Sequence, residues 1–130
     1  MQLLPHHIGI VVSDLERSTA FYTALGFETV KDLPAEDGSR AIRFIRLGEF
    51  ELELFWYAES AAPAFEPAGR GQLGFRHFAL CTTDIDGTLA SLKAAGVAPS
   101  DLEVRRMPIG YSLLFLRDPD GLEIEIMQEG

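Results

Sequence analysis

Residues 6–27 read HHIGIVVSDLERSTAFYTALGF, and residues 76–97 read RHFALCTTDIDGTLASLKAAGV. When the sequence is laid over itself with a shift of 70 residues, the two stretches align without a gap. Identical residues then meet at three informative places: His7 on His77, Asp14 on Asp84, and Gly26 on Gly96. A repeat of this kind indicates one supersecondary unit that is built twice.

The ends of the two halves are also alike. With the shift grown to 72 residues, FELELF from Phe50 falls on LEIEIM from Leu122. This second alignment pairs acidic residues, Glu51 with Glu123 and Glu53 with Glu125. Few residues are identical, but two matching pieces in the same order argue against chance similarity.

Each half reads as a strand, a helix and three further strands. Residues 7–12 form a short apolar run with branched side chains, which is typical of a strand. Ser13 and Glu16 have the spacing of a capping box, so we expect the helix to start there. Gly26 stands where a glycine can take the left-handed conformation that ends a helix. The second half offers the same signals at Thr83, Asp86 and Gly96.

Hairpins follow the helix in both halves. Predicted strands over residues 40–47 and 50–57 flank Gly48-Glu49, and strands over 111–117 and 122–127 flank Asp118-Pro119-Asp120-Gly121. The sequence therefore predicts an α+β fold, a single domain of two βαβββ modules in tandem. We expect the first module over residues 1–57, a linker with proline and glycine breaks over residues 58–74, and the second module over residues 75–130.

The composition is that of a folded, acidic protein. At 130 residues and 47% hydrophobic residues, the chain fits one domain with its own core. Its net charge of −9 repels nucleic-acid backbones and leaves a small molecule as the expected ligand. The longest apolar run, residues 8–12, is too short to enter a membrane as a span, which predicts a cytoplasmic protein. The single cysteine, Cys81, is expected in the core among its apolar neighbours.

Each predicted module offers one histidine at its first strand and glutamates in its last strand. His7 and Glu53 are 46 residues apart, and His77 and Glu125 are 48 residues apart. Two histidines with two carboxylates form a catalytic type of ligand set, because they leave positions on a divalent ion free for water or substrate. Such a set accepts nickel, zinc, cobalt, manganese or iron.

Simpler interpretations compete with this metal site. A histidine that opens an apolar strand is more often hydrogen-bonded at an edge or in the core, and alternate glutamates commonly point to solvent. The repeat favours His7 over its neighbour His6, because His6 falls on Arg76. Alternation places Glu51 and Glu53 on one face about 7 Å apart, so it does not choose between them.

Three motifs together resemble the vicinal oxygen chelate superfamily. HHIGIVVSDLERSTAFYTALGF resembles the opening of these proteins, and RHFAL resembles the start of their second module. DPDGLEIEI resembles their closing Asp-Pro-x-Gly motif, in which the ligand glutamate follows four residues after the glycine. The correspondence implies the metal ligands His7, Glu53, His77 and Glu125. It also implies a curved mixed sheet around a metal cleft, one bound divalent ion, and a homodimer.

The pattern of two histidines and two glutamates resembles glyoxalase I, a lactoylglutathione lyase. This implies a metal-dependent lyase or isomerase that acts on a small substrate with adjacent oxygens through an enediolate-type intermediate, with Glu125 and Glu53 as catalytic bases. The chain departs from the glutathione-binding pattern, because Val11 stands where bacterial glyoxalase I has arginine and residues 55–57 replace an asparagine. Candidates for a more apolar substrate pocket are Phe55, Tyr57 and Tyr111.

Other members of the superfamily supply alternative functions. Extradiol dioxygenases use three ligands and a tyrosine where Phe115 stands, and fosfomycin-modifying transferases would leave Glu53 unexplained. Methylmalonyl-CoA epimerase resembles the chain at His-Ile-Gly-Ile but has glutamine in place of Glu53, so a CoA-ester epimerase is the second enzyme candidate. Metal-free bleomycin-binding proteins form a different class, which the net charge favours and four ligand-type residues in one cleft disfavour.

Overall fold

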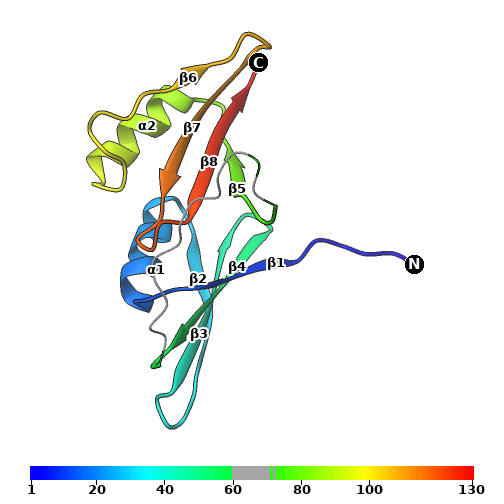
Figure 1. The fold of residues 1–130 in the computed structure, drawn as a ribbon, viewed down its shortest axis with the longest axis vertical. Coiled ribbons are helices and arrows are strands. Elements are labelled where there is room, and N and C mark those ends of the chain that lie inside the picture. The colour runs from blue at the N-terminus through cyan, green and yellow to red at the C-terminus, as the bar shows by residue number, and fades with distance from the viewer. Residues whose placement is uncertain (60–70, 72) are drawn as a thin grey trace. The chain divides into compact units, whose positions relative to one another are not determined.

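The computed structural model describes residues 1–59, 71 and 73–130 (Figure 1). The chain divides into two compact units, Met1–Pro63 and Ala64–Gly130, here called unit 1 and unit 2. Of the linker expected over residues 58–74, residues 60–70 and 72 lie outside the described residues. In the described part of the chain, no helix has the length and apolar character needed to traverse a bilayer.

Unit 1 folds, within residues 1–59, as a strand, a helix and three strands. Its elements are β1 (His7–Val11), α1 (Leu15–Ala24), β2 (Glu28–Pro34), β3 (Arg40–Leu47) and β4 (Phe50–Tyr57). The strands form one sheet in the order β1-β4-β3-β2, in which β1 is parallel to β4 and the other pairs are antiparallel. The first strand of the unit therefore lies beside its last strand.

Unit 2 repeats this architecture over its described residues. Its elements are β5 (Phe78–Cys81), α2 (Ile85–Ala94), β6 (Arg105–Arg106), β7 (Tyr111–Arg117) and β8 (Glu123–Glu129). They form a second sheet in the order β5-β8-β7-β6, again with the first strand parallel to the last. The predicted α+β fold of two βαβββ modules is thereby confirmed.

The helices begin one residue later than the capping-box pattern predicts. Asp14 is the N-cap of α1 and accepts a hydrogen bond from the backbone nitrogen of Arg17 at 3.0 Å. The carboxylate of Glu16 lies 3.0 Å from Nη1 of Arg43 on β3. The N-cap assigned to Ser13 is therefore wrong by one residue, because the carboxylate of Asp14 caps the helix.

The second helix is capped in the same manner. Asp84 accepts from the backbone nitrogen of Gly87 at 3.0 Å, so the cap assigned to Thr83 and Asp86 is wrong in the same direction. Both helices end as predicted at a glycine in the left-handed region, with φ of 106° at Gly26 and 76° at Gly96.

Each sheet packs one face against its helix. The opposite face has no helix of the same unit on it and is here called the helix-free face. In unit 1, Leu52 and Leu54 of β4 are fully buried together with Tyr22 of α1. In unit 2, Ile124 and Ile126 of β8 are buried in the same way, together with three residues of α2, Ile85, Leu89 and Leu92. Because strand residues alternate, the glutamates between these core residues lie on the helix-free face.

Cys81 is exposed, so its predicted place in the core is wrong. It ends β5, where Phe78 is buried and Ala79 is exposed. Alternation along this short strand puts Cys81 on the helix-free face together with Ala79. Its apolar neighbours in the sequence thus belong to the other face of the strand.

Candidate metal centre

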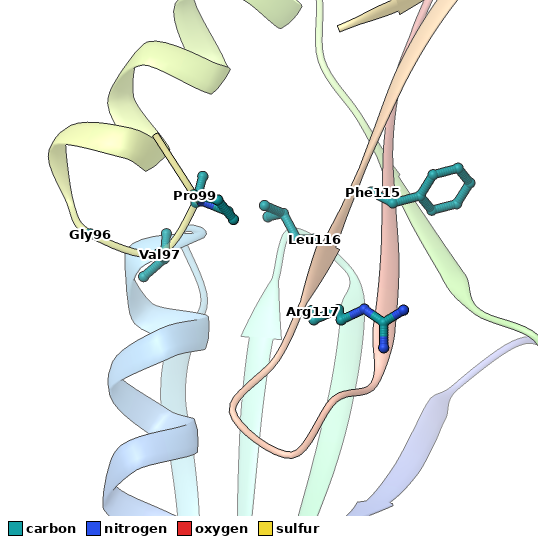
Figure 2. Close-up of a pocket in the computed structure, with 7 residues that line it drawn as sticks. Gly96, Val97, Pro99, Phe115, Leu116 and Arg117 are labelled. Atoms are coloured by element: carbon teal, nitrogen blue, oxygen red, sulfur yellow. The ribbon is translucent and has the colours of Figure 1, made fainter. Parts of the chain in front are cut away.

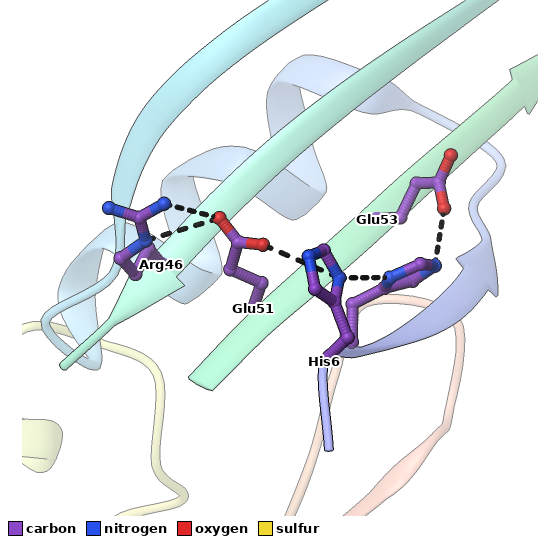
Figure 3. A network of polar contacts seen from close by, with 5 residues as sticks. His6, Arg46, Glu51 and Glu53 are labelled. Carbon is purple, nitrogen blue, oxygen red and sulfur yellow. Dashed lines mark hydrogen bonds and ion pairs between the residues drawn. The ribbon is translucent and has the colours of Figure 1, made fainter. Parts of the chain in front are cut away.

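His7 and Glu53 are brought together in unit 1 by the parallel pairing of β1 and β4. The register sets His7 beside Glu51 and Gly9 beside Glu53. The Nε2 atom of His7 lies 2.8 Å from an Oε2 atom of Glu53 (Figure 3). The side chain of Glu53 is 15% exposed and that of His7 is 36% exposed, so the pair sits at a partly buried position that solutes can reach.

A glycine on β1 makes room beside this pair. A Cβ atom at Gly9 would lie 3.2 Å from Cε2 of Phe55, which is closer than most side-chain contacts. The missing side chain lets the Phe55 ring lie against the strand. Phe55 in turn stacks on Tyr57, with 6.2 Å between the ring centroids and 9° between the ring planes.

His77 and Glu125 form the matching pair in unit 2. His77 directly precedes β5, and the register of β5 with β8 sets Ala79 beside Glu125. Nε2 of His77 lies 3.5 Å from Oε2 of Glu125, and their side chains are 24% and 16% exposed. The same pair of atoms, Nε2 and Oε2, thus faces each other in both units.

A phenylalanine flanks the histidine in each unit. Phe44 on β3 pairs with Glu53 across the sheet, and its ring meets that of His7 edge-on at 6.3 Å between centroids. Phe115 on β7 pairs with Glu125, and its ring meets that of His77 edge-on at 5.4 Å. This contact was not predicted, although a shift of 71 residues places Phe44 on Phe115 and marks the two positions as equivalent.

The second glutamate of each strand has a different set of neighbours. Glu51 lies 2.6 Å from Nη2 of Arg46, and the hydrogen bond from Arg46 lowers the pKa of Glu51. His6 connects this ion pair to the histidine of unit 1, because its Nδ1 lies 3.9 Å from Glu51 and 2.8 Å from Nδ1 of His7 (Figure 3). In unit 2, Oε1 of Glu123 lies 3.6 Å from Nδ1 of His77.

The donor atoms in each unit suit two neighbouring ligands of one divalent ion. With metal–ligand bonds of about 2.1 Å, adjacent ligand atoms lie about 3.0 Å apart in octahedral geometry and about 3.4 Å apart in tetrahedral geometry. The Nε2–Oε2 distances of 2.8 and 3.5 Å are close to these values. Among the described residues, no three His, Cys, Asp or Glu side chains lie close enough together to bind one metal ion. Each unit thus contributes two of the four expected ligands.

The residues expected to line a substrate pocket lie on the helix-free faces. Phe55 and Tyr57 follow Glu53 along β4, and Tyr57 is 39% exposed. Tyr111 lies at the start of β7, opposite Glu129. It is four residues from Phe115, which corresponds to about 14 Å along the strand. The structure thus places Phe55 beside a candidate ligand and Tyr111 at the far end of its strand.

A pocket of about 450 Å³ lies elsewhere in unit 2, between the segment after α2 and strand β7 (Figure 2). Leu116 points toward Pro99 in this pocket, whereas the Phe115 ring points away from it. The pocket is lined by Gly96, Val97, Ala98, Pro99, Phe115, Leu116 and Arg117. Neither His77 nor Glu125 belongs to its lining, so the pocket is separate from the candidate ligands.

Known proteins with similar sequences include enzymes of two kinds. The protein named "Uncharacterized protein YwkD" of Bacillus subtilis is 30% identical over 127 residues, which cover 95% of both chains. Lactoylglutathione lyase GLX1 of Arabidopsis thaliana is 30% identical over 135 residues, which cover 95% of this chain and 44% of the plant protein. Mitochondrial methylmalonyl-CoA epimerase of Homo sapiens is 25% identical over 127 residues, which cover 95% of this chain and 72% of the human protein.

The fold and the family agree with the resemblance found in the sequence. The solved structure of the glyoxalase family protein from Enterococcus faecalis matches at a TM-score of 0.77 and 30% identity, covering 95% of this chain and 96% of that chain. The family model of the Glyoxalase/Bleomycin resistance protein/Dioxygenase superfamily matches residues 4–126. With nearly the whole chain matched, the protein belongs to the Glyoxalase/Bleomycin resistance protein/Dioxygenase superfamily.

Proposed function

We propose that His7, Glu53, His77 and Glu125 bind one divalent metal ion and that the chain is a metal-dependent lyase or isomerase of the glyoxalase I type. The observation that carries this proposal is the recurrence of one atom pair, His Nε2 facing Glu Oε2, in both units. A single histidine–glutamate contact would be an ordinary hydrogen-bonded pair. Two equivalent contacts, each at the spacing of neighbouring ligands, supply the four donors of a catalytic site with open positions.

The reaction would be a proton transfer between adjacent carbons of a small substrate with neighbouring oxygens. When bound, the ion supplies a Lewis acid that holds two adjacent oxygens and stabilises negative charge that develops on them. Glu125 would remove a proton from one carbon, and Glu53 would serve the opposite face of the substrate. Both carboxylates are mostly buried yet not sealed off, which suits groups that exchange protons with a ligand.

The part of the substrate that does not react would contact an apolar wall. Phe55 and Tyr57 stack beside Glu53, and Val11 is 54% exposed on the helix-free face of β1. None of these side chains carries the charge that would bind the carboxylates of glutathione. We therefore propose a substrate whose tail is less polar than glutathione, handled by the same proton-transfer chemistry.

The experiment that tests the metal site is a measurement of metal content. The purified protein, loaded with nickel, zinc, cobalt or manganese and then desalted, should retain about one ion for each set of His7, Glu53, His77 and Glu125. His77→Ala should lose most of this metal, whereas Glu49→Gln, at an exposed hairpin position, should keep it. A wild-type protein that retains no divalent ion and binds none on titration would contradict the proposal and favour a metal-free binding protein.

We also propose that the protein acts as a homodimer. A mixing experiment tests whether the two halves of a site come from different chains. If they do, refolding His7→Ala together with His77→Ala yields a mixed dimer in which one site is intact, so activity returns to part of the wild-type value. If each site is completed within one chain, every site in the mixture keeps one defect and no activity returns.

A CoA-ester epimerase is the second candidate function. The 25% identity with human methylmalonyl-CoA epimerase over 127 residues favours it, and the proton transfer would use the same two glutamates. The two functions can be separated by their substrates. Exchange of the α-proton of a branched CoA thioester in deuterium oxide would support the epimerase, whereas turnover of a thiol–aldehyde adduct would support the glyoxalase-type lyase.

A further inference from the structure

We infer that Glu123 is a positioning residue for the ligand His77, and that His6 takes this role for His7 because Arg46 already occupies the equivalent glutamate, Glu51. This inference rests on the proposed metal site. It assigns roles to the two glutamates that alternation alone could not distinguish from the ligands. The roles differ between units although the positions are equivalent.

The two imidazole nitrogens of His77 face different carboxylates. Nε2 faces Glu125 at 3.5 Å, and Nδ1 faces Glu123 at 3.6 Å. In both units Nε2 is the histidine nitrogen that faces the candidate ligand glutamate. We therefore assign Nε2 to the metal, and Nδ1 is then the outer nitrogen, the one that does not bind the metal. The outer nitrogen of a metal-bound histidine usually donates its proton to a carboxylate, a carbonyl or water, which fixes the orientation of the ring.

The Nδ1 atom of His77 is buried and has no hydrogen-bond partner among the described residues. Glu123 is the carboxylate nearest to it, and the Glu123 side chain is only 21% exposed. An unsatisfied buried polar atom is costly, so a small approach of Glu123 would be favourable. The carboxylate would then hold the ring with Nε2 directed toward Glu125.

Unit 1 uses a different partner for the same nitrogen. Nδ1 of His7 lies 2.8 Å from Nδ1 of His6, so one of these two nitrogens donates to the other. With Nε2 of His7 on a metal, His7 must be the donor and His6 the acceptor. Glu51 lies 3.9 Å beyond His6 and is held by Nε and Nη2 of Arg46 at 3.1 and 2.6 Å.

The arginine at the equivalent position of unit 2 leaves its glutamate available. Arg117 pairs with Glu123 across the sheet just as Arg46 pairs with Glu51. Among the described residues, however, every ion pair of Glu123 is with His77 and Arg117 enters none. In the part of the chain that the structure describes, the ion pairs of Glu51 are with Arg46 and His6, whereas Glu123 pairs with the ligand histidine itself. The engaged arginine in unit 1 and the disengaged arginine in unit 2 account for this difference.

The test compares Glu123→Gln with the matched variant Glu51→Gln in a cobalt titration followed by the visible absorption of bound Co²⁺. Loss of an outer partner typically weakens metal binding by about 10- to 100-fold, so Glu123→Gln and His6→Ala should show this loss. Glu51→Gln should bind cobalt within about threefold of the wild type. The absorption spectrum should change for Glu123→Gln, because the ring of a ligand would be less well oriented.

Each outcome bears on a separate statement. A wild-type protein that binds no cobalt contradicts the proposed function itself. If Glu123→Gln binds cobalt as tightly as the wild type does, the inference is overturned. It is also overturned if Glu51→Gln and Glu123→Gln lose the same amount of cobalt affinity. Binding that survives Glu125→Gln but is abolished in Glu123→Gln would make Glu123 a ligand, which also overturns it. Thermal unfolding without metal checks that each variant folds, and Glu123→Asp, which keeps the carboxylate, serves as a second variant with an intermediate loss expected.

Discussion

The two units share the inner part of the candidate site and differ in what surrounds it. In both, a histidine at or directly before the first residue of the first strand faces a glutamate of the last strand and meets a phenylalanine edge-on. Outside this group, unit 1 has a chain of contacts through His6, Glu51 and Arg46, whereas in unit 2 the described residues place Glu123 beside the histidine. The difference indicates that the βαβββ unit fixes the donor pair by its topology and leaves the supporting contacts to individual side chains.

The topology has this effect because the first and last strands of each unit are parallel neighbours. His7 begins the edge strand β1 and His77 directly precedes the edge strand β5. The register sets Gly9 beside Glu53 and Ala79 beside Glu125, so each histidine lies two residues before the ladder partner of its glutamate, on the same face of the sheet. The buried residues that alternate with the glutamates hold the register, since a slip by one residue would turn the leucines of β4 to the wrong face. The topology therefore fixes which residues form each donor pair, whereas the outer residues act on the orientation of the histidine rings.

The largest expected effect comes from removing the carboxylate in either donor pair. Glu53→Gln and Glu125→Gln should each lower turnover by about 100- to 10,000-fold, because each removes a proton-transfer group while keeping the shape of the side chain. Steady-state kinetics on metal-loaded protein, with unfolding curves beside them, would measure this. Glu49→Gln is the matched control and should stay near wild type. Full activity in Glu125→Gln would remove its role as a base and break the equivalence of the two units.

The next largest effect concerns the helices that support the two sheets. Asp14→Ala and Asp84→Ala should each lower the free energy of unfolding by about 1 kcal/mol, because each removes the acceptor for a backbone nitrogen of the first helical turn. Asp101→Ala, at an exposed turn position, is the control and should change stability little. Urea unfolding provides the measurement. A loss for Asp14→Ala alone would show that the two caps are not equivalent.

The sequence predicts the parts of the structure that depend on pattern and length. The repeat located both helices, the hairpins of both units and the histidines, because alternation and helical spacing report directly on which face is buried. The predicted cap of α1 was displaced by one residue because both Ser13 and Asp14 are good N-caps, and only the structure shows which of the two side chains caps the helix. Cys81 was misplaced because a run of apolar letters does not say which alternate residue faces the core.

The neighbours of the candidate ligands could not be predicted in the same way. Glu51 and Glu53 have the same spacing pattern, and their difference lies in a cross-strand arginine whose side chain could have taken several directions. The same applies to Arg117, which occupies the equivalent ladder position without the equivalent ion pair among the described residues. Side-chain direction of this kind depends on three-dimensional neighbours, which a one-dimensional repeat does not contain.

A smaller effect is expected at the glycine that makes room for Phe55. Gly9→Ala should raise the KM by a few-fold, because the new methyl group would displace the Phe55 ring from 3.2 Å. Its stability should change little, since a strand residue gains about 0.5–1 kcal/mol over glycine and overpacking costs about 1 kcal/mol. The opposite change at the equivalent position, Ala79→Gly, should lower stability by about 0.5–1 kcal/mol without altering the KM. An unchanged KM in Gly9→Ala would argue against substrate contact by Phe55.

The smallest expected effect is a difference between Arg46 and Arg117 in how their contribution to stability depends on pH. The hydrogen bond from Arg46 lowers the pKa of Glu51 below its ordinary value of 4.5. A lowered folded-state pKa contributes stability that is present above the ordinary value and is lost as the pH falls through the folded value. Wild type should therefore exceed Arg46→Gln in stability at neutral pH, and the difference should shrink in acid.

Arg117→Gln is the matched variant, and its difference from wild type should not depend on pH over the same range. Urea unfolding from about pH 7 to about pH 3, at low and high salt, would measure both differences. Salt should reduce the effect of Arg46→Gln, because the Arg46 side chain is 51% exposed and its charge is screened. If both variants showed the same acid-dependent loss, Arg117 would be engaged with Glu123 in solution. Glu123 would then be unavailable to His77, and the supporting contacts of the two units would be alike.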